Sequence, residues 1–357
     1  RSPFPAVGVQ SRSPSLHRVV TPAAALPTVA TGAHQIVIQG SDFGPPTELA
    51  LVQVELRSQR PGSSFVIAVP SCVPTSSDHS ELTCPAPSGI GESLVPRITV
   101  AGQLSQVNVS NSLVSYATPA VTRVSGPGAN RASTAGGEQV LLTGANFGVP
   151  SVSNTAFQRI MYGSASELPF VAVDCMVVSD TRMTCLTGAG TGQGHSWQVH
   201  LEGGESPVSF MDTSYQWPSV TVFDGPGSDL AATQGSEVVD ISGVNFGTVQ
   251  RNAIDFVTYE RNGTVYTADA CAVVVDHVLI RCLTAPGTGK GLSWKVFVDG
   301  QESRSPTTNY APPSVTGFMP AAALPVGGGA DLWVLGTGQQ LWTSQLRCSV
   351  AVPHARP

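Results

Sequence analysis

Apolar and polar residues alternate along short segments of this chain, with the period of two that predicts half-buried β-strands. Val140 and Leu142 form one such pair, and Val239 and Ile241 repeat it about a hundred residues later. Glycine turns stand on both sides of each segment. Turns need the positive φ that glycine adopts without strain. The pattern predicts an all-β chain of short strands.

A Gly-x-x-Phe-Gly motif follows the alternating strand three times. Its residues are Gly40, Phe43 and Gly44; Gly144, Phe147 and Gly148; and Gly243, Phe246 and Gly247. We expect each phenylalanine to close one end of a β-sandwich, while an exposed ring that stacks on a ligand is the alternative. A fixed interval of this length predicts an array of small domains.

Modules end on a tyrosine followed by proline, as at Tyr116, Tyr215 and Tyr310. The predicted division is a linker or tail over 1–18, modules 1 to 3 over 19–118, 119–217 and 218–312, and a partial module 4 over 313–357. Linkers of two or three residues that contain proline leave little freedom. We therefore expect tandem sandwiches in an elongated array.

Each full module contains two cysteines on strand-like segments. The pairs are Cys72 with Cys84, Cys175 with Cys185, and Cys271 with Cys282. Their spacing suits two neighbouring strands joined by a hairpin, and a disulfide there places the chain in an oxidising compartment. Zinc binding is the alternative, but no Cys-x-x-Cys or paired His accompanies any pair. Cys348 stands at the first-cysteine position of module 4 and has no partner in this chain.

Glycine-rich runs at 188–194 and 287–291 resemble phosphate loops. A strand-like segment follows each run, at Trp197 and at Trp294, where a phosphate loop needs a helix. Flexible connections between strands are the preferred interpretation.

Together these motifs resemble the IPT/TIG module, an immunoglobulin-like β-sandwich of the E-set type found in plexins, fibrocystin-like proteins and many surface proteins. Modules 2 and 3 match throughout, module 1 from Ile36 onward, and module 4 only in its first half. A looser resemblance links the chain to the long extracellular arrays of algal and protist surface proteins. The resemblance implies extracellular protein–protein contact and provides no catalytic residues.

Composition argues against nucleic-acid binding, membrane spanning and catalysis. A net charge of −6, from 24 acidic and 18 basic residues, gives no basic footprint for nucleic acid. No apolar run is long enough to span a membrane. The chain begins at Arg1 without a signal peptide, which we interpret as a mature or clipped piece of a precursor. The seven histidines share no repeat position and no catalytic signature is present, although a site assembled across modules is an alternative. We expect no enzyme activity, no cofactor and no metal.

Asn108 and Asn262 begin N-glycosylation sequons. We therefore predict a structural or adhesive array at the cell surface or in a filament-type assembly, whose partners are surface glycoproteins or copies of itself. One alternative is the ligand-binding ectodomain of a plexin- or fibrocystin-like receptor. A second is the accessory module of a secreted carbohydrate-active enzyme.

Overall fold

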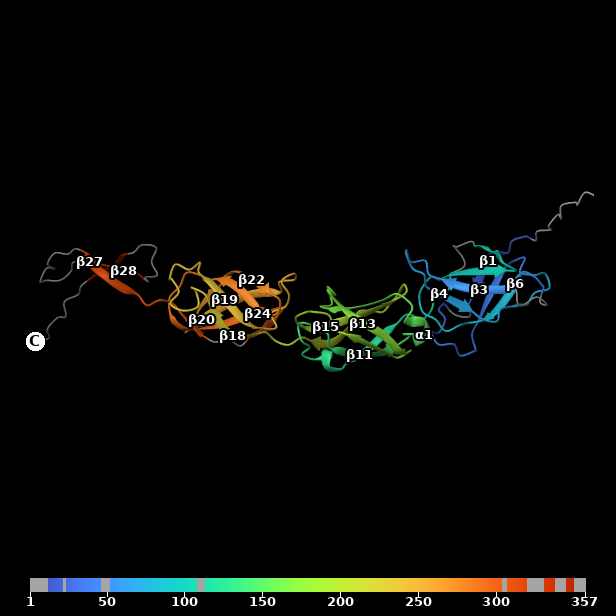
Figure 1. The fold of residues 1–357 in the computed structure, drawn as a ribbon, viewed down its shortest axis with the longest axis horizontal. Helices are drawn as coiled ribbons and strands as arrows, with labels where there is room; N and C mark the ends of the chain where they lie inside the picture. Colours follow the sequence, from blue (N-terminus) through green and yellow to red (C-terminus); the bar gives the residue numbers. More distant parts are fainter. Residues whose placement is uncertain are drawn as a thin grey trace, which may run out of the picture. The chain divides into compact units, whose positions relative to one another are not determined.

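The computed structural model describes residues 12–21, 24–45, 52–107, 113–303, 307–319, 331–337 and 345–349 (Figure 1). The chain divides into two compact units. Unit 1 comprises Arg1–Asn130, Gly137–Gly188 and Gly194–Thr213, and unit 2 comprises Arg131–Gly136, Ala189–Gln193 and Ser214–Pro357. The predicted module boundaries at 118/119, 217/218 and 312/313 stay a prediction. The all-β prediction is confirmed, since the described helices are the short α1 (Pro150–Ser153) and a 3₁₀ turn (Pro127–Ala129).

Unit 1 begins with two sheets. The first has the order β5 (Val73–Pro74), β6 (Glu81–Pro85), β2 (Gln35–Ser41), β1 (Ser15–Val20) and β9 (Gln106–Val107). The second has the order β4 (Val66–Val69), β3 (Val52–Arg57), β7 (Val95–Val100) and β8 (Gln103–Leu104). Every second residue of the longer strands is buried, as Ile36 and Ile38 of β2 are, so each sheet gives one apolar face to the core.

The next sheet runs without interruption through eight strands. Its order is β10 (Ala120–Ser125), β11 (Gln139–Ala145), β14 (Arg182–Leu186), β13 (Phe170–Ser179), β12 (Gln158–Gly163), β15 (Gln193–Leu201) and β16 (Gly204–Glu205), and β17 (Ser209–Ser214) also pairs with β15. The ten-residue β13 makes this continuity possible because it pairs with β14 along one part and with β12 along another.

In unit 2 the corresponding strands form two separate sheets. One has the order β18 (Ser219–Asp224), β19 (Val238–Val244), β23 (Leu279–Leu283) and β22 (Asp269–Val275). The other has the order β21 (Thr264–Thr267), β20 (Ile254–Arg261), β24 (Lys290–Val298) and β25 (Gln301–Glu302), with β26 (Thr307–Asn309) beside β24. A hairpin turn at Asn262 and Gly263 folds β21 back on β20, so this edge does not continue into β22.

A three-stranded sheet ends the described part of unit 2. It contains β27 (Ser314–Met319), β28 (Asp331–Thr337) and β29 (Gln345–Ser349). Cys348 lies in β29 opposite Leu332 of β28.

The Gly-x-x-Phe-Gly motif has the same conformation in all three copies. Phe43, Phe147 and Phe246 are each 0% exposed. A Cβ on the first glycine would collide with a backbone oxygen of the preceding strand and with the phenylalanine ring, as Gly144 shows with Ala120 and Phe147. The final glycine has a φ of +79° to +82° in the three copies, the left-handed region that other residues enter with strain.

Two buried tryptophans, Trp197 of β15 and Trp294 of β24, stand at equivalent positions in the cores of units 1 and 2. Trp197 stacks on Tyr162 with ring centroids 4.2 Å apart, and its indole nitrogen donates to Thr213 at 2.8 Å. In unit 2, Trp294 stacks on Tyr259 at 4.3 Å. The buried indole N–H therefore keeps a hydrogen-bond partner, which a Trp in a core requires.

Candidate interaction surface

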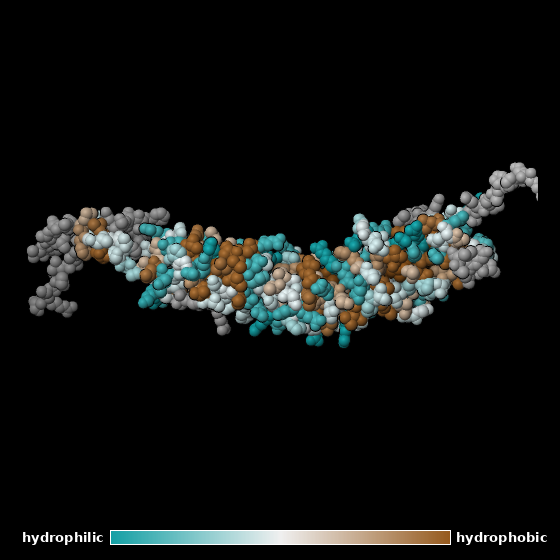
Figure 2. All heavy atoms as spheres, in the orientation of Figure 1, coloured by the Kyte–Doolittle hydropathy of each residue, from teal (hydrophilic) through white to brown (hydrophobic). Residues whose placement is uncertain are grey.

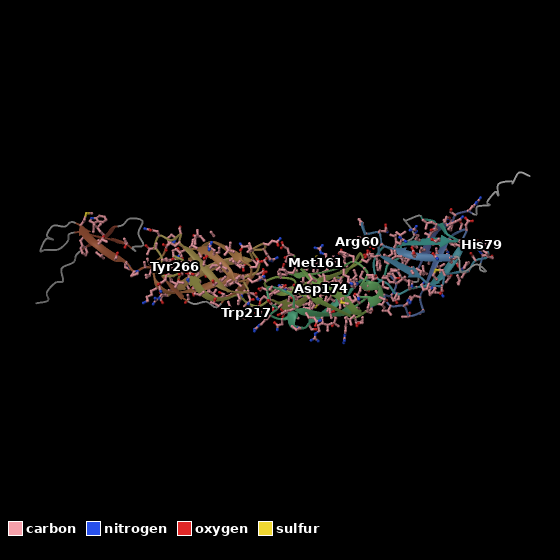
Figure 3. The ribbon with its side chains drawn as sticks, in the orientation of Figure 1. Arg60, His79, Met161, Asp174, Trp217 and Tyr266 are labelled. Carbon is pink, nitrogen blue, oxygen red and sulfur yellow. A yellow bond between two sulfur atoms is a disulfide. The ribbon has the colours of Figure 1, made fainter. Side chains whose placement is uncertain are left out.

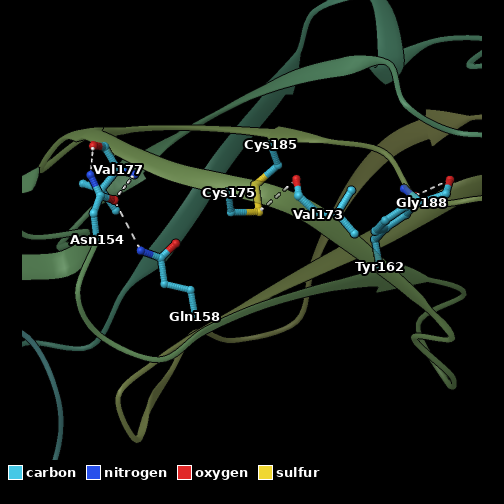
Figure 4. Close-up of a disulfide and its surroundings, with 8 residues drawn as sticks. All are labelled: Asn154, Gln158, Tyr162, Val173, Cys175, Val177, Cys185 and Gly188. Carbon is cyan, nitrogen blue, oxygen red and sulfur yellow. Dashed lines mark hydrogen bonds between the residues drawn. A yellow bond between two sulfur atoms is a disulfide. The ribbon is translucent and has the colours of Figure 1, made fainter. Parts of the chain in front are cut away.

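The structure joins the six cysteines of the three full modules as Cys72–Cys84, Cys175–Cys185 and Cys271–Cys282. The second pair links β13 to its antiparallel neighbour β14 (Figure 4). Each disulfide therefore fixes one point in the pairing of two adjacent strands. The side chain of Cys348 lies outside the described residues. The described residues contain no cluster of three or more metal-ligating side chains.

A β-bulge in β13 lies beside the second disulfide. The register with β14 shifts between Val173 and Met176, and Asp174 within the bulge has a φ of +49°. The side chain of Asn154 stabilises the strand after the bulge. Its amide donates to the carbonyl of Val177 at 3.1 Å and its oxygen accepts from the Val177 N–H at 2.8 Å (Figure 4). The bulge inserts one extra residue into the alternation of the strand. Met176 and Val178, at even positions, therefore point outward, as Val173 does before the bulge.

The exposed side of β13 is apolar except at Asp174 in the bulge. Val171, Val173, Met176 and Val178 of β13 are 39%, 47%, 59% and 54% exposed. We call this the β13 face, and its remaining members are the half-buried Leu141, Met161, Thr184 and Leu186 on neighbouring strands. Figure 2 shows hydrophobic surface, in brown, over both units, and Met161 and Asp174 are labelled in Figure 3. None of the eight members carries a charge, and Asp174 at the bulge is the only charged residue of β13.

The register identifies the equivalent positions in unit 2. Leu141 lies opposite Thr184 next to Cys185, and Asp240 lies opposite Arg281 next to Cys282. Asp240 and Arg281 form an ion pair at 2.7 Å. The hydrogen bond from Arg281 lowers the pKa of the Asp240 carboxyl. An ion pair in unit 2 thus stands where unit 1 presents Leu141 and Thr184.

The first sandwich of unit 1 is also charged at an equivalent position. Glu55 of β3 stands where β12 has Met161, and it forms an ion pair with Arg57 at 2.7 Å. The apolar character of the β13 face is therefore not a requirement of the fold, because two related sandwiches fold with charged groups there.

One buried carboxylate in unit 1 supports the fold and does not belong to this face. Glu202 accepts hydrogen bonds from the Ser63 hydroxyl at 2.8 Å and the Phe157 N–H at 2.9 Å, and Arg60 lies 3.7 Å away. Burial acts to raise the pKa of Glu202, but hydrogen bonds from Ser58, Phe157 and Ser63 and the charge of Arg60 outweigh it and lower the pKa. A satisfied charge of this kind is structural.

The other residues singled out from the sequence lie apart from one another. The three motif phenylalanines are inside their cores and offer no ring surface to a ligand. Asn262 is exposed in the β20–β21 turn, with a φ of +51°. Asn108 lies outside the described residues. The glycine-rich runs lead into strands β15 and β24.

Sequence reasoning missed the β13 face. The segment Phe170-Val-Ala-Val-Asp-Cys-Met-Val-Val contains one charged residue in nine, which is typical of a strand buried on both sides. The available signal was the contrast between modules. Arg281 precedes Cys282 as Thr184 precedes Cys185, and Asp240 stands three residues before the motif glycine Gly243 as Leu141 does before Gly144.

Comparison with known proteins gives a family for one segment. The model of the IPT/TIG domain family matches residues 119–216. The curated proteins contain no match to the chain. In the part of the chain that is described, no helix has the length and apolar character to cross a membrane.

Solved structures of surface proteins resemble the chain at low identity. The extracellular region of plexin A4 is 13% identical over 98% of this chain and 30% of its own length, with a TM-score of 0.26. The adhesin FdeC of Escherichia coli is 10% identical over 85% of this chain and 100% of its own, with a TM-score of 0.25. The surface glycan-binding protein PbSGBP-B of Prevotella bryantii is 16% identical over 72% of this chain and 53% of its own length, with a TM-score of 0.33. The chain thus spans less than a third of the plexin ectodomain.

Proposed function

Since residues 119–216 form an IPT/TIG domain, we propose that this chain is a non-catalytic interaction protein of the cell exterior and that its β13 face packs against the same face of a second copy. The observation that carries the proposal is the exposure of four uncharged side chains on β13, next to Leu141 and Thr184, the two positions where an equivalent sandwich has the Asp240–Arg281 ion pair. The three disulfides support an oxidising compartment.

Pairing of sheet faces suits the geometry better than strand addition. β13 pairs with β12 over residues 170–172 and with β14 over residues 173–179, and the Asn154 side chain bonds both backbone groups of Val177, so an incoming strand would have to displace Asn154. A face can pack on an identical face about a two-fold axis, which is the commonest arrangement in homo-oligomers. Like copies of a chain with a charge of −6 repel one another. An uncharged face is where they meet with the smallest electrostatic cost.

The energy of this contact indicates a weak association. Full burial of a Val or Met side chain contributes about 1.5–3 kcal/mol. Roughly half of each of the four side chains is exposed and both copies bury them, so the eight side chains together contribute roughly 6–12 kcal/mol. Association costs about 4–15 kcal/mol of lost freedom. We therefore expect concentration-dependent pairing that becomes visible only at high protein concentration.

A double variant tests the proposal without an unpaired charge. Leu141→Asp combined with Thr184→Arg places in unit 1 the ion pair that Asp240 and Arg281 form in unit 2. Sedimentation velocity up to millimolar concentration is expected to show association of the wild-type chain, strengthened by added salt, and a monomeric double variant with an unchanged unfolding temperature. Association that persists in the double variant, or a wild-type chain that stays monomeric, contradicts the proposal.

A matched control uses an equally exposed valine elsewhere. Val265 on β21 is 54% exposed and is not part of the β13 face. Val265→Asp adds a charge to the chain, and it is expected to leave the association constant within a factor of two of wild type. Loss of association in this control would show that a charge outside the β13 face also prevents pairing, and would contradict the assignment of pairing to that face.

A further inference from the structure

A cavity in unit 2 has the composition of a binding site and plays no part in the proposed pairing. Its volume is about 620 Å³, and its walls include Arg131, Gln216, Trp217, Val244, Asn245 and Glu302, all in unit 2. Sites for small molecules have volumes of about 300–1,000 Å³. The cavity combines one large aromatic surface with donors and acceptors of hydrogen bonds.

Trp217 is the aromatic wall, and its side chain is not used by the core. It is 52% exposed, whereas Trp197 and Trp294 are 0% and 3% exposed. The guanidinium of Arg131 lies over the indole, 5.4 Å from the ring centroid. A cation already occupies this cation–π position, so the remaining exposed indole surface is available to an uncharged ring. Trp217 is labelled in Figure 3.

The fold does not require an aromatic ring at this position. The repeat places Thr118 and Pro312 where Trp217 stands, two residues after the closing tyrosines Tyr116 and Tyr310. A tryptophan that is 52% exposed leaves a large aromatic surface in water. A ligand that stacks on the indole removes that surface from water.

The segment that bears Trp217 is held in place. The amide of Asn245 donates to the carbonyl of Trp217 at 3.0 Å and to the side-chain oxygen of Gln216 at 3.4 Å. The hydroxyl of Thr134 donates to the side-chain oxygen of Asn245 at 3.4 Å. A pre-positioned wall reduces the ordering cost of binding.

The polar walls indicate a ligand rich in hydroxyls. The Glu302 carboxylate accepts hydrogen bonds, Arg131 donates them, and Gln216 does both. A hydroxyl donates and accepts, so it matches all three groups. Arg131 and Glu302 also bring one charge of each sign. Lys295 lies 3.6 Å from Glu302 and 3.7 Å from Glu260, so the four charged groups sum to zero. This balance favours an uncharged ligand over an anion or a cation.

From these contacts we propose that the cavity binds neutral saccharides, with a sugar ring stacked on Trp217 and its hydroxyls hydrogen-bonded to Glu302, Arg131 and Gln216. The apolar side of a pyranose ring covers the indole while its equatorial hydroxyls point sideways to polar groups. This activity is independent of the β13 face, which lies in unit 1.

Affinity electrophoresis of the full chain tests this binding. The probes are mixed-linkage β-glucan, arabinoxylan, galactomannan and xyloglucan in the gel, with alginate as the charged polysaccharide. At least one neutral polymer is expected to retard the wild-type chain. Trp217→Ala is expected to weaken the retardation at least tenfold, Glu302→Gln several-fold, and Trp217→Phe less than Trp217→Ala, because a phenyl ring still stacks.

Phe210→Ala is the matched control, because this aromatic side chain is 66% exposed, belongs to unit 1 and does not line the cavity. It is expected to migrate as wild type does, and the unfolding temperature of each variant shows that it folds. The proposal is overturned if no neutral polymer retards the wild-type chain, if only alginate does, or if folded Trp217→Ala migrates as wild type. None of these results bears on the association measured for the β13 face.

Discussion

The side-chain amide of Asn245 donates a hydrogen bond to the carbonyl oxygen of Trp217 at 3.0 Å. Asn146 makes the same bond to the carbonyl of Thr118 at 2.8 Å. Both asparagines stand before the phenylalanine of Gly-x-x-Phe-Gly and have φ values of +67° and +63°. Asparagine tolerates this left-handed conformation better than most residues. The asparagine therefore has two roles. Its backbone adopts the left-handed conformation of the motif, and its side chain holds the segment before the module by a hydrogen bond.

Replacing this asparagine separates its two roles. Asn245→Gly keeps the positive φ and loses the amide, at a cost of about 1 kcal/mol for the hydrogen bond. Asn245→Ala loses both, and we expect it to cost about 1–2 kcal/mol more because of left-handed strain. Calorimetry is expected to show a lower unfolding temperature for both variants, and lower for Ala than for Gly. Equal temperatures would show that the backbone conformation carries no strain.

The first glycine of the motif is required for space. Gly144→Ala places a Cβ against the Ala120 carbonyl and the Phe147 ring, and overpacking of this kind costs about 3 kcal/mol or more. Gly137→Ala is the control, because Gly137 has a φ of +81° and no neighbouring atom within 4 Å, so its cost is only about 1–2 kcal/mol of strain. Denaturant unfolding measures both. A smaller loss for Gly144→Ala than for Gly137→Ala would contradict the steric explanation.

Removal of a disulfide tests its contribution to one module. Cys175 and Cys185 are separated by 10 residues, and closing a loop of that length stabilises the folded state by about 3 kcal/mol. We expect Cys175→Ala combined with Cys185→Ala to lower the unfolding free energy by about that amount. Reductant should then have no further effect on this transition. Continued sensitivity of the same transition to reductant would assign the stabilisation to another pair.

Alkaline pH is expected to destabilise unit 2 through its tyrosines. The hydroxyls of Tyr259 and Tyr310 lie 2.6 Å apart in the core, and burial raises the pKa of both above the usual value. The unfolded chain ionises above about pH 10 while the folded chain stays neutral. Stability is therefore complete below about pH 10 and falls as the pH rises above it.

Tyr310→Phe tests this pH dependence. Removing one titrating group should make the loss of unfolding free energy between pH 9 and 11 less steep than in wild type, by up to about 1.4 kcal/mol per pH unit. Thermal unfolding across this pH range provides the slope. The slope, and not the stability at neutral pH, is the readout, because the variant also loses the Tyr310 hydrogen bond to Ala285. An unchanged slope would show that Tyr310 does not contribute.

Glycosylation at Asn262 is expected when the chain passes through a secretory pathway. The asparagine is exposed at a hairpin turn, where a glycan meets no neighbouring strand. Glycopeptide mapping of the native protein should find sugar on Asn262 and none after Thr264→Ala. An unmodified Asn262 in secreted native material would contradict the expectation.

The sequence by itself determined the local structure that repeats. Gly144 and Phe147 form a motif whose steric and conformational demands lie within four residues, so its copies predict the same bend wherever they occur. The alternation at Val140 and Leu142 likewise predicts which side of β11 is buried. The Asn262-Gly263 pair is a hairpin signal as well as part of a sequon, and it predicts the turn before β21.

Only the tertiary structure decided which apolar residues meet solvent. Val173 and Met176 belong to an apolar run that predicts a strand buried on both sides, but the bulge at Asp174 and the absence of a second layer over β13 among the described residues expose them. Trp217 and Glu302 are 85 positions apart, and the cavity exists because the chain brings them together. Exposure depends on what packs above a residue, and that partner is distant in sequence, so no local pattern encodes it.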